Sequence, residues 1–239
     1  MDSDNTVIIG IDEAGRGPLI GDMVVSGVVA RESVLKELIG KGLADSKQLT
    51  PSDRYRIFLE ALSKGVVVVS IYIPPWRIDR ENLNDLELKA MENILRILVK
   101  IVKPQPNTQV KIYVDEVKGR SSLLDNYSKK LLKNQVEFKM EAKADVLYSI
   151  VSLASIFAKV FRDVNLNALR KLVGDFGSGY PVDPQTIEWF KNTYRENKPP
   201  PVFLRRSWSN LKNLAPKWYQ EKGREGKPGY KSLFDFAKR

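Results

Sequence analysis

Five short apolar runs, rich in β-branched residues and bounded by turn residues, constrain the fold of this chain more than any other feature. Runs of this length and composition are typical of buried strands. They lie at residues 7–11, 23–30, 66–73, 110–114 and 136–140. Helical periodicity follows at residues 51–64, 80–102, 121–134 and 145–173. This order predicts an α/β sandwich with a mixed sheet, whose early strands are antiparallel and whose later strands are parallel.

The last quarter of the chain has a different pattern, in which glycine and proline separate shorter helical segments. Asp183 is a predicted helix N-cap, with Pro184 at the first helical position. After three prolines, a second helix is predicted at residues 205–218. The sequence therefore predicts three regions, which are an α/β domain at residues 1–180, a basic helical region at 181–220 and a flexible tail at 221–239.

The chain contains no cysteine and no histidine. This composition excludes disulfides, thiolate catalysis, histidine general bases and the common zinc sites. Any catalysis must therefore use carboxylates, hydroxyls, amines or bound ions. The first residues lack a basic stretch followed by a long apolar one, and no later run is long enough to span a membrane. We expect a cytoplasmic protein with no membrane segment.

Positive charge is concentrated towards the C-terminal end. The 39 Lys and Arg residues and 29 Asp and Glu residues give a net charge of +10. Residues 185–239 carry 13 of the basic residues and 5 of the acidic ones, so +8 of the net charge lies there. Such a field favours an anionic partner such as nucleic acid, although any single lysine serves solubility equally well. The predicted phosphate contacts are Lys191, Arg195, Arg205, Arg206, Lys212 and Lys217.

Acidic residues follow three of the predicted strands. Asp12 and Glu13 come directly after the first strand, Asp115 and Glu116 follow the fourth, and Asp145 follows the fifth. Active sites of α/β sheets lie at the carboxyl ends of strands, and oxygen ligands are those that Mg²⁺ prefers. Each cluster taken alone has an ordinary explanation as a cap or a solvated turn, Asp145 above all. Because three clusters occur without any histidine, the sequence predicts a divalent-metal site.

A short turn, Gly15-Arg16-Gly17, comes directly after the first acidic pair. Glycines allow a sugar-phosphate backbone to approach closely, and a guanidinium can pair with a phosphate or a hydroxyl. A Gly-x-Gly pattern by itself is more often only a tight turn. Beside the carboxylates, it indicates a nucleic-acid contact.

These residues belong to a longer set of motifs that closely resembles the type 2 ribonuclease H family, in particular its archaeal members. The matching segments are GIDEAGRGP at residues 10–18, DSKQLT at 45–50, KAD at 143–145, GSGYP at 177–181 and RRSW at 205–208. The resemblance spans roughly residues 7–210, and its opening nonapeptide is highly specific. It implies a ribonuclease H-like fold, with a mixed five-stranded sheet flanked by helices and a small C-terminal helical extension.

The resemblance also implies an activity and its metal site. The chain would be an endonuclease that cuts the RNA strand of RNA/DNA hybrids and cuts 5′ to ribonucleotides embedded in duplex DNA. Asp12, Glu13, Asp115 and Asp145 would hold two Mg²⁺ or Mn²⁺ ions. In a two-metal mechanism, one ion activates a water and the other stabilises the leaving 3′-oxygen. The products would carry 3′-hydroxyl and 5′-phosphate ends.

Further roles carried over from the family concern the substrate. Gly15, Arg16 and Gly17 would contact the 2′-hydroxyl of the ribonucleotide. Tyr180 would stack on the neighbouring deoxyribose, and Lys47 would hold a phosphate near the scissile bond. These roles suit the chemistry, because the 2′-hydroxyl is what distinguishes RNA from DNA at one site.

Two departures from the family pattern are visible, and one geometric question arises. Ala142 lies where members often carry a histidine, and Glu116 adds a second acid beside Asp115. Neighbouring side chains on a strand point to opposite faces, so Asp12 and Glu13 should share an ion only where the strand ends or bulges. Asp12 is therefore the preferred bridging ligand.

The C-terminal tail carries an apolar cluster beyond a glycine-rich tether. It resembles the short motif by which replication proteins dock on the sliding clamp, with Leu233 and Phe236 as the inserted side chains. It departs from that motif in having Tyr230 where glutamine is usual and Ala237 where a second aromatic is usual. The alternative is a helix end that packs on the body of the protein.

Other residues are predicted to be structural. Asp163 lies five helical turns from Asp145, too far for a shared ion, and is predicted to pair with Arg162 or another residue on the helix surface. Small residues of the long helix should let it pack close to the sheet, and three tryptophans should anchor helices. These residues are Ser152, Ala154, Ser155, Ala158, Trp189, Trp208 and Trp218.

Two other functional classes remain open from the residues alone. The chain could be a non-catalytic nucleic-acid-binding module whose carboxylates only cap helices and turns. It could also be another nuclease on the same fold, such as a junction resolvase. A type 3 relative is less favoured, because only about six residues precede the first strand and that family carries an N-terminal binding domain.

Overall fold

The computed structural model describes residues 6–40, 43, 49–105, 108–133 and 136–223. By their contacts, the residues divide into two units. The sheet unit comprises Met1–Arg16, Met23–Tyr72 and Leu83–Val164, and the C-terminal unit comprises Gly17–Asp22, Ile73–Asn82 and Asn165–Arg239. The predicted regions 1–180, 181–220 and 221–239 follow a different grouping and stay a prediction. The difference arises because two segments from the first half of the chain pack with its last third.

A mixed five-stranded sheet forms the centre of the sheet unit as described, with the strand order β3-β2-β1-β4-β5. β1 is antiparallel to β2 and parallel to β4, and β4 is parallel to β5. This confirms the predicted mixed α/β sheet. The strands are β1 (Thr6–Ala14), β2 (Met23–Arg31), β3 (Val67–Ile73), β4 (Gln109–Asp115) and β5 (Val136–Glu141).

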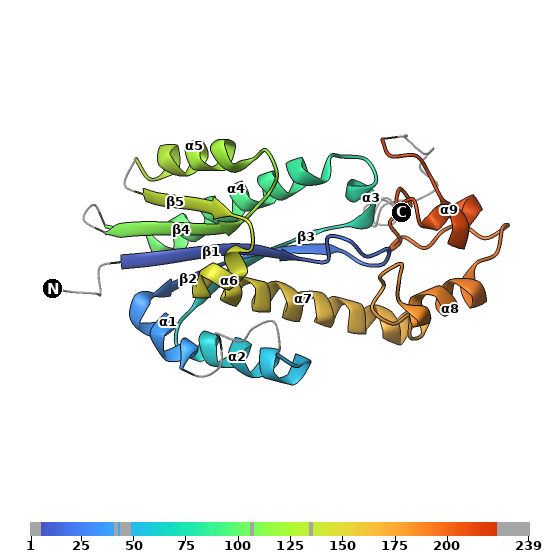
Figure 1. Ribbon diagram of the computed structural model, residues 1–239, viewed down its shortest axis with the longest axis horizontal. Coiled ribbons are helices and arrows are strands. Elements are labelled where there is room, and N and C mark those ends of the chain that lie inside the picture. Colours follow the sequence, from blue (N-terminus) through green and yellow to red (C-terminus); the bar gives the residue numbers. More distant parts are fainter. Residues whose placement is uncertain (1–5, 41–42, 44–48, 106–107, 134–135, 224–239) are drawn as a thin grey trace, which may run out of the picture. The chain divides into compact units, whose positions relative to one another are not determined.

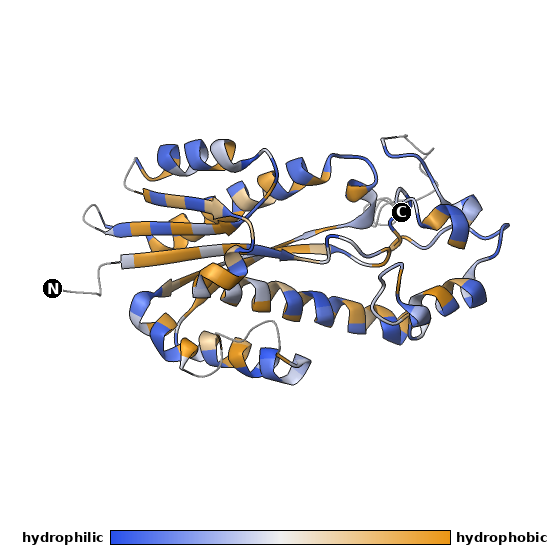
Figure 2. Cartoon of the chain, in the orientation of Figure 1, coloured by the Kyte–Doolittle hydropathy of each residue, from blue (hydrophilic) through white to orange (hydrophobic). Residues whose placement is uncertain are grey.

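Helices cover both faces of the sheet (Figure 1). One face carries α4 (Leu83–Val102) and α5 (Ser121–Leu131). The other carries α1 (Glu32–Ile39), α2 (Pro51–Ser63) and the first part of α7 (Ser149–Val173). Because β1 and β2 are covered on both faces, they are apolar along most of their length, as the hydropathy colouring in Figure 2 shows.

α7 packs directly on the backbone of β1. A Cβ atom added at Gly10 would lie 2.4 Å from the carbonyl oxygen of Ile150, so only glycine fits there. Ala154 and Ala158 are fully buried on the same helix. The predicted close approach of this helix to the sheet is therefore confirmed.

The C-terminal unit has its own apolar core. It contains α3 (Pro75–Ile78), α8 (Pro184–Thr193), α9 (Leu211–Leu214) and a 3₁₀ helix, Pro216–Trp218. Leu19 and Ile20 are fully buried in this core, where Trp189 and Trp218 also pack. The N–H of Leu19 donates to the carbonyl of Gly179 at 2.7 Å. The segment that follows Arg16 is thus an integral part of the C-terminal unit.

Several start and stop signals act as predicted. Thr50 Oγ1 accepts a hydrogen bond of 3.2 Å from the N–H of Asp53 at the start of α2, and Gly65 has φ +79° beyond its end. Asp183 accepts a hydrogen bond of 3.0 Å from the N–H of Gln185 at the start of α8.

Other helix predictions are wrong. The long helix breaks at Tyr148, whose backbone is extended, so α6 (Ala144–Leu147) and α7 are separate, and Asp145 lies in the first turn of α6 instead of capping it. The single helix predicted at residues 205–218 is two short ones, because residues 203–205 bond to the segment 17–22 and Pro216 cannot continue a helix. The helix predicted to reach residue 134 ends at Leu131, and α1 was not predicted.

Asp163, which was predicted to pair with Arg162 or another residue on the helix surface, forms an ion pair with a neighbouring helix. Asp163 Oδ2 lies 3.3 Å from Nη2 of Arg54, which belongs to α2. The ion pair therefore joins two helices on one face of the sheet. Its role is structural, as expected.

Candidate metal centre

β1 is longer than predicted and includes the first acidic pair, which was expected to follow the strand. Asp12 and Glu13 lie inside β1, paired in unbroken register with Ser26 and Val25 of β2. The pairing of β1 with β4, by contrast, ends at Ile11. Asp12 and Glu13 therefore occupy the short stretch of β1 that extends beyond the end of the β1–β4 ladder.

Asp12 and Glu13 point to opposite faces of β1, yet their carboxylates approach each other. Asp12 accepts a side-chain hydrogen bond from Ser155 of α7, whereas Glu13 lies near Glu87 of α4. Each of Asp12, Glu13 and Asp115 has a carboxylate oxygen within 4.8 Å of those of the other two. The convergence requires neither a bulge nor the end of β1, because β4 no longer pairs with this stretch.

Asp115 ends β4 and is fixed by the start of α6. Its Oδ1 accepts a hydrogen bond of 2.9 Å from the N–H of Ala144. Lys143 has φ 60°, a left-handed conformation that is costly for lysine and that directs the chain into α6. Glu116 is exposed and lies outside the group of three carboxylates. Asp115 is therefore the better placed of the two neighbouring acids.

Asp145 lies close to this group without being part of it. It is absent from the three carboxylates that approach within 4.8 Å. Its negative charge nevertheless contributes to the raised pKa values of Asp12 and Asp115. Among the described residues, the structure thus brings three of the four predicted carboxylates together and leaves the fourth nearby.

Burial makes this group electrostatically costly. Asp12 is 5% exposed, and burial, together with the charges of Asp115 and Asp145, raises its pKa to about 7 although a hydrogen bond from Ser155 opposes the shift. Burial and the charge of Asp12 raise the pKa of Glu13 well above its ordinary value, and burial also raises that of Asp115. An all-oxygen group with mutually repelling charges fits a hard divalent cation, whose charge would relieve the repulsion.

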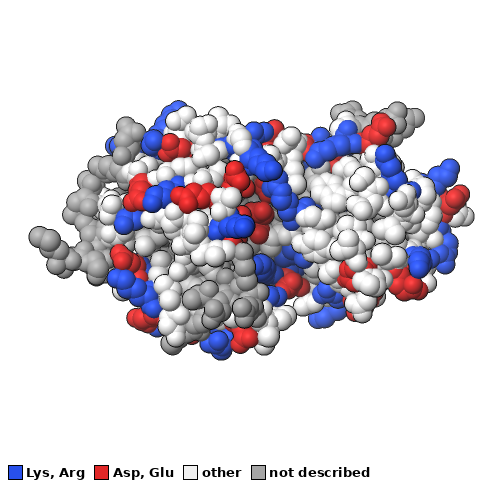
Figure 3. Space-filling model, viewed as in Figure 1, with Lys and Arg blue, Asp and Glu red and all other residues white. Residues whose placement is uncertain are grey.

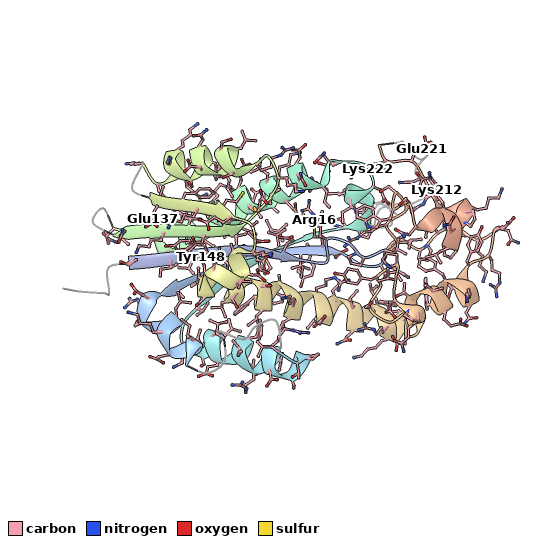
Figure 4. The ribbon with its side chains drawn as sticks, in the orientation of Figure 1. Arg16, Glu137, Tyr148, Lys212, Glu221 and Lys222 are labelled. Carbon is pink, nitrogen blue, oxygen red and sulfur yellow. The ribbon has the colours of Figure 1, made fainter. Side chains whose placement is uncertain are left out.

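The turn after β1 is held by α4. Gly15 has φ 84°, and the guanidinium of Arg16, labelled in Figure 4, hydrogen-bonds to two side chains. Nη1 pairs with Oε2 of Glu87, and Nη2 donates to Oδ1 of Asn84 at 2.5 Å. Neither Glu87 nor Asn84 was singled out from the sequence.

Gly17 and Tyr180 lie together in the C-terminal unit. A Cβ atom added at Gly17 would lie 3.4 Å from the ring of Tyr180, which is 38% exposed. Trp208 Nε1 donates a 3.0 Å hydrogen bond to the carbonyl of Gly17. Two predicted substrate residues are thus adjacent, and Trp208 fixes one of them instead of serving only as a packing anchor.

The two arginines predicted to bind the nucleic-acid backbone differ in exposure. Arg205 is fully buried, and its Nε donates to the carbonyl of Gly21 at 3.0 Å. This burial argues against a phosphate contact for Arg205, which instead holds the segment 17–22. Arg206 is half-buried and donates from Nε to the carbonyl of Trp218 at 2.8 Å.

Other predicted contacts are exposed or lie outside the described residues. Lys191, Arg195, Lys212 and Lys217 are all exposed. Figure 3 shows basic side chains on the C-terminal unit and alternating acidic and basic side chains across the region of β4 and β5. Three residues that were predicted to contact the substrate or a partner lie outside the described part of the chain: Lys47, Leu233 and Phe236.

Of the site residues that were not predicted from the sequence, one could have been identified from its sequence pattern. Glu87 falls on the buried stripe of α4, where Ala90, Met91 and Ile94 are apolar. A charged residue on such a stripe is unusual and indicates a specific partner. Ser155 was interpreted as a packing residue because small residues surround it, and nothing local indicates its hydrogen bond to Asp12.

The fold and the site together define a class of protein. A mixed five-stranded sheet that brings carboxylates together at the ends of β1 and β4 is the architecture of a ribonuclease H-like enzyme with a divalent-metal centre. The family model for ribonuclease HII matches residues 9–211 of this chain. The chain belongs to the ribonuclease HII family. It is an endonuclease of the hydrolase class, a family whose members cleave RNA in RNA/DNA hybrids and use divalent metal ions.

Comparison with individual proteins supports this membership. Ribonuclease HII of Hyperthermus butylicus is 44% identical over 231 residues, which cover 95% of this chain and 93% of that protein. The crystal structure of ribonuclease H2 from Pyrococcus horikoshii OT3 matches with a TM-score of 0.75 and 34% identity, covering 89% of this chain and 98% of that one. The ribonuclease HII in a PCNA:RNase HII complex from Archaeoglobus fulgidus matches with a TM-score of 0.70 and 29% identity, covering 96% and 100%.

Among the helices of the described residues, none has both the length and the apolarity needed to cross a bilayer.

Proposed function

We propose that the chain cuts the RNA strand of RNA/DNA hybrids and also incises duplex DNA on the 5′ side of an embedded ribonucleotide. The products would carry 3′-hydroxyl and 5′-phosphate ends. The observation that carries this proposal is the group of carboxylates formed by the buried Asp12 and the half-buried Glu13 and Asp115, with the Gly15–Gly17 turn just after the first two in the chain. Hydrolysis would take place in the cytoplasm, which stays a prediction from the sequence.

The carboxylates Asp12, Glu13, Asp115 and Asp145 would hold two ions, Mg²⁺ or Mn²⁺. Bound there, the ions supply an activated water and charge stabilisation for the leaving 3′-oxygen. Asp12, the most buried of the four, would be the bridging ligand, and Ser155 would fix its orientation. Asp115 is oriented by the N–H of Ala144, so its carboxylate enters the reaction already aligned.

Selection of a ribonucleotide would come from the turn and from Tyr180. Gly15, Arg16 and Gly17 would contact the 2′-hydroxyl, and the exposed ring of Tyr180 beside Gly17 would stack on the adjacent deoxyribose, which lacks that hydroxyl. Lys47 would hold a phosphate near the scissile bond; its position lies outside the described residues.

The duplex backbone would be held by basic residues of the C-terminal unit. Arg206 and the exposed residues Lys191, Arg195, Lys212 and Lys217 are available for phosphate contacts. Binding should therefore weaken steeply with salt, since each neutralised phosphate releases a counterion. Neutralising Lys212 and Lys217 together should make that salt dependence shallower.

The C-terminal tail would bind a sliding clamp through Leu233 and Phe236. The Archaeoglobus fulgidus relative forms a complex with PCNA, which supports this proposal for the present chain. Deletion of residues 230–239 should then abolish clamp binding without changing cleavage of short duplexes. Equal clamp binding by the full-length and truncated chains would contradict it.

Cleavage mapping tests the proposed function. A labelled DNA duplex with one central ribonucleotide, an RNA/DNA hybrid, an all-DNA duplex and a four-way junction are incubated with the protein in Mg²⁺ or Mn²⁺. We expect a single incision 5′ to the ribonucleotide, cuts in the RNA of the hybrid, and no cuts in the other two substrates. Junction cleavage would favour a resolvase, and metal-independent binding without cleavage would favour a non-catalytic module.

A further inference from the structure

A buried glutamate on α4 faces the turn that follows the metal-binding strand. Glu87 is fully buried, and its Oε2 pairs with Nη1 of Arg16. Its other oxygen, Oε1, is also buried and has no hydrogen-bond partner in the part of the chain that the structure describes. Glu87 therefore places a carboxyl group in the protein interior with only one of its two oxygens hydrogen-bonded.

Stability alone does not account for Glu87. Its neighbours on the buried stripe of α4 are apolar, so a leucine at this position would extend that stripe and avoid the desolvation of a carboxylate. A buried ion pair is weak evidence for stability and is better explained where it fixes a geometry. The geometry that Glu87 fixes is that of Arg16.

The guanidinium of Arg16 is held by two residues of one helical turn. Asn84 Oδ1 accepts from Nη2 at 2.5 Å, three residues before Glu87 on α4. Positions i and i+3 lie on the same side of a helix, so both acceptors meet the planar guanidinium together. This two-point contact restricts both the position and the tilt of the Arg16 side chain.

The turn of α4 that carries these acceptors is itself anchored to the loop after β4. Asn84 Nδ2 donates to the carbonyl of Lys118 at 3.2 Å, and Arg120 lies 2.7 Å from Asp85. The acceptors therefore belong to a frame that also contains the loop following Asp115. Arg16 is fixed relative to that frame.

We infer that Glu87, assisted by Asn84, is a positioning residue for ribonucleotide recognition: it holds the Arg16 side chain and thereby the backbone of the Gly15–Gly17 turn in the shape that accepts a ribose. This inference rests on the proposed function of that turn. Glu87 does not touch the substrate. It acts through Arg16.

The electrostatics of the site agree with this arrangement. The negative charge of Glu87 and the positive charge of Arg16 both reach Glu13, with opposite effects on the pKa of its carboxyl. The pair thus adds little net charge next to the metal-binding carboxylates. Glu87 can hold Arg16 without leaving a full positive charge that would compete with a cation.

The test measures binding selectivity and does not depend on catalysis. Two labelled DNA duplexes, one with a single central ribonucleotide and one without, are titrated with the protein in Ca²⁺ in place of Mg²⁺, and the ratio of the two affinities is determined by fluorescence anisotropy. Glu87→Leu should lower this ratio about tenfold, because the guanidinium loses its charged acceptor. Glu87→Gln, which still offers an oxygen to Arg16, should lower it by a smaller factor.

Glu92→Gln is the matched control. It makes the same carboxylate-to-amide change on α4, at a half-buried position beyond Glu87 that takes no part in holding Arg16 or in anchoring this turn of the helix. We expect its affinity ratio to equal that of the wild type. Thermal melting of all variants checks that they fold, and if Glu87→Leu does not fold, Glu87→Gln decides the outcome.

A double-mutant cycle with Arg16→Ala tests whether Glu87 acts through Arg16. If it does, the double variant Arg16→Ala/Glu87→Gln should be no less selective than Arg16→Ala alone. Additive losses would overturn the inference, as would an unchanged ratio in both Glu87 variants when the wild type is selective. A wild type that binds both duplexes equally would contradict the proposed function itself, a result distinct from either of these.

Discussion

The backbone N–H of Glu13 donates a hydrogen bond of 2.7 Å to Oδ1 of Asp12, the residue directly before it. This bond turns the carboxylate of Asp12 along its own strand towards Glu13. Two side chains that leave β1 on opposite faces can therefore place oxygens within 4.8 Å of each other and of Asp115. The arrangement is favourable for a cation and unfavourable for the metal-free protein.

Asp12→Asn should abolish cleavage and stabilise the metal-free protein. In the folded chain the pKa of Asp12 is raised to about 7, whereas an unfolded Asp has a pKa of about 3.9. The folded state therefore keeps a proton that the unfolded state has released, so stability falls as the pH rises from about 4 to 7 and stays low above it. In EDTA at pH 8, Asn should raise the free energy of unfolding by about 1–3 kcal/mol.

The control for this variant is the same comparison of stability at a lower pH. At pH 5 Asp12 is still protonated in the folded state, but most unfolded chains have released this proton, so the stability difference between Asp12→Asn and the wild type should be only about a third of that at pH 8. Loss of stability in the variant at pH 8 without metal would contradict the account. So would cleavage in Mg²⁺ at the wild-type rate, since removal of a bridging ligand should cost at least about a thousandfold.

Metal affinity should fall as the pH is lowered below about 7. An ion can bind only after the Asp12 proton leaves, and the pKa of Glu13 is raised as well, so binding must release at least one proton. Calorimetric titration with Mn²⁺ should show an affinity about tenfold lower at pH 6 than at pH 8. An affinity that does not change over this range would contradict the raised pKa of Asp12.

Trp208→Phe should impair ribonucleotide incision without unfolding the protein. Phenylalanine keeps an aromatic ring beside the guanidinium of Arg205 but removes the donor to the carbonyl of Gly17. We expect incision to slow by about three- to tenfold, whereas the affinity for a DNA duplex without a ribonucleotide should not change. Trp76→Phe is the control, because Trp76 is 55% exposed in the same unit; equal losses in both variants would contradict the role of Trp208.

Two glycines should respond very differently to alanine. Gly10→Ala places a methyl group 2.4 Å from the carbonyl oxygen of Ile150, so α7 must move away from β1, and we expect a loss of about 3 kcal/mol or more. Gly65→Ala meets no atom within 4 Å and incurs only the strain of φ +79°, about 1 kcal/mol. Urea denaturation of both variants measures the difference, and equal losses would contradict the close packing at Gly10.

Much of the fold follows from local patterns in the sequence. The strands are short, β-branched and bounded by turn residues, and caps such as Thr50 and Asp183 act within three residues of their position. The break at Tyr148 could not be predicted in this way. It depends on Lys143 and Ala144, which fold back so that Asp115 receives a hydrogen bond from a residue 29 positions later.

The candidate site was likewise predictable only in part. The acidic residues could be identified because each follows an apolar strand pattern, and the resemblance to the ribonuclease H family indicates that they act together. Glu87 contacts Arg16, 71 positions away in the sequence, and Trp208 contacts Gly17, 191 positions away. No local sequence pattern predicts contacts between residues so far apart in the chain. The burial of Arg205 was missed for the same reason. An arginine in a basic stretch is normally predicted to lie on the surface, and its contact with the distant carbonyl of Gly21 leaves no local pattern.

The location of bound metal tests the central claim most directly. Crystals of the protein soaked in Mn²⁺ would be measured at the manganese absorption edge, and an anomalous difference map would be calculated. We expect the strongest peak between Asp12, Glu13 and Asp115, at about 2.0–2.3 Å from their oxygens. A protein that cleaves in Mn²⁺ but shows its manganese peaks only elsewhere would contradict the assignment of these carboxylates as the metal centre.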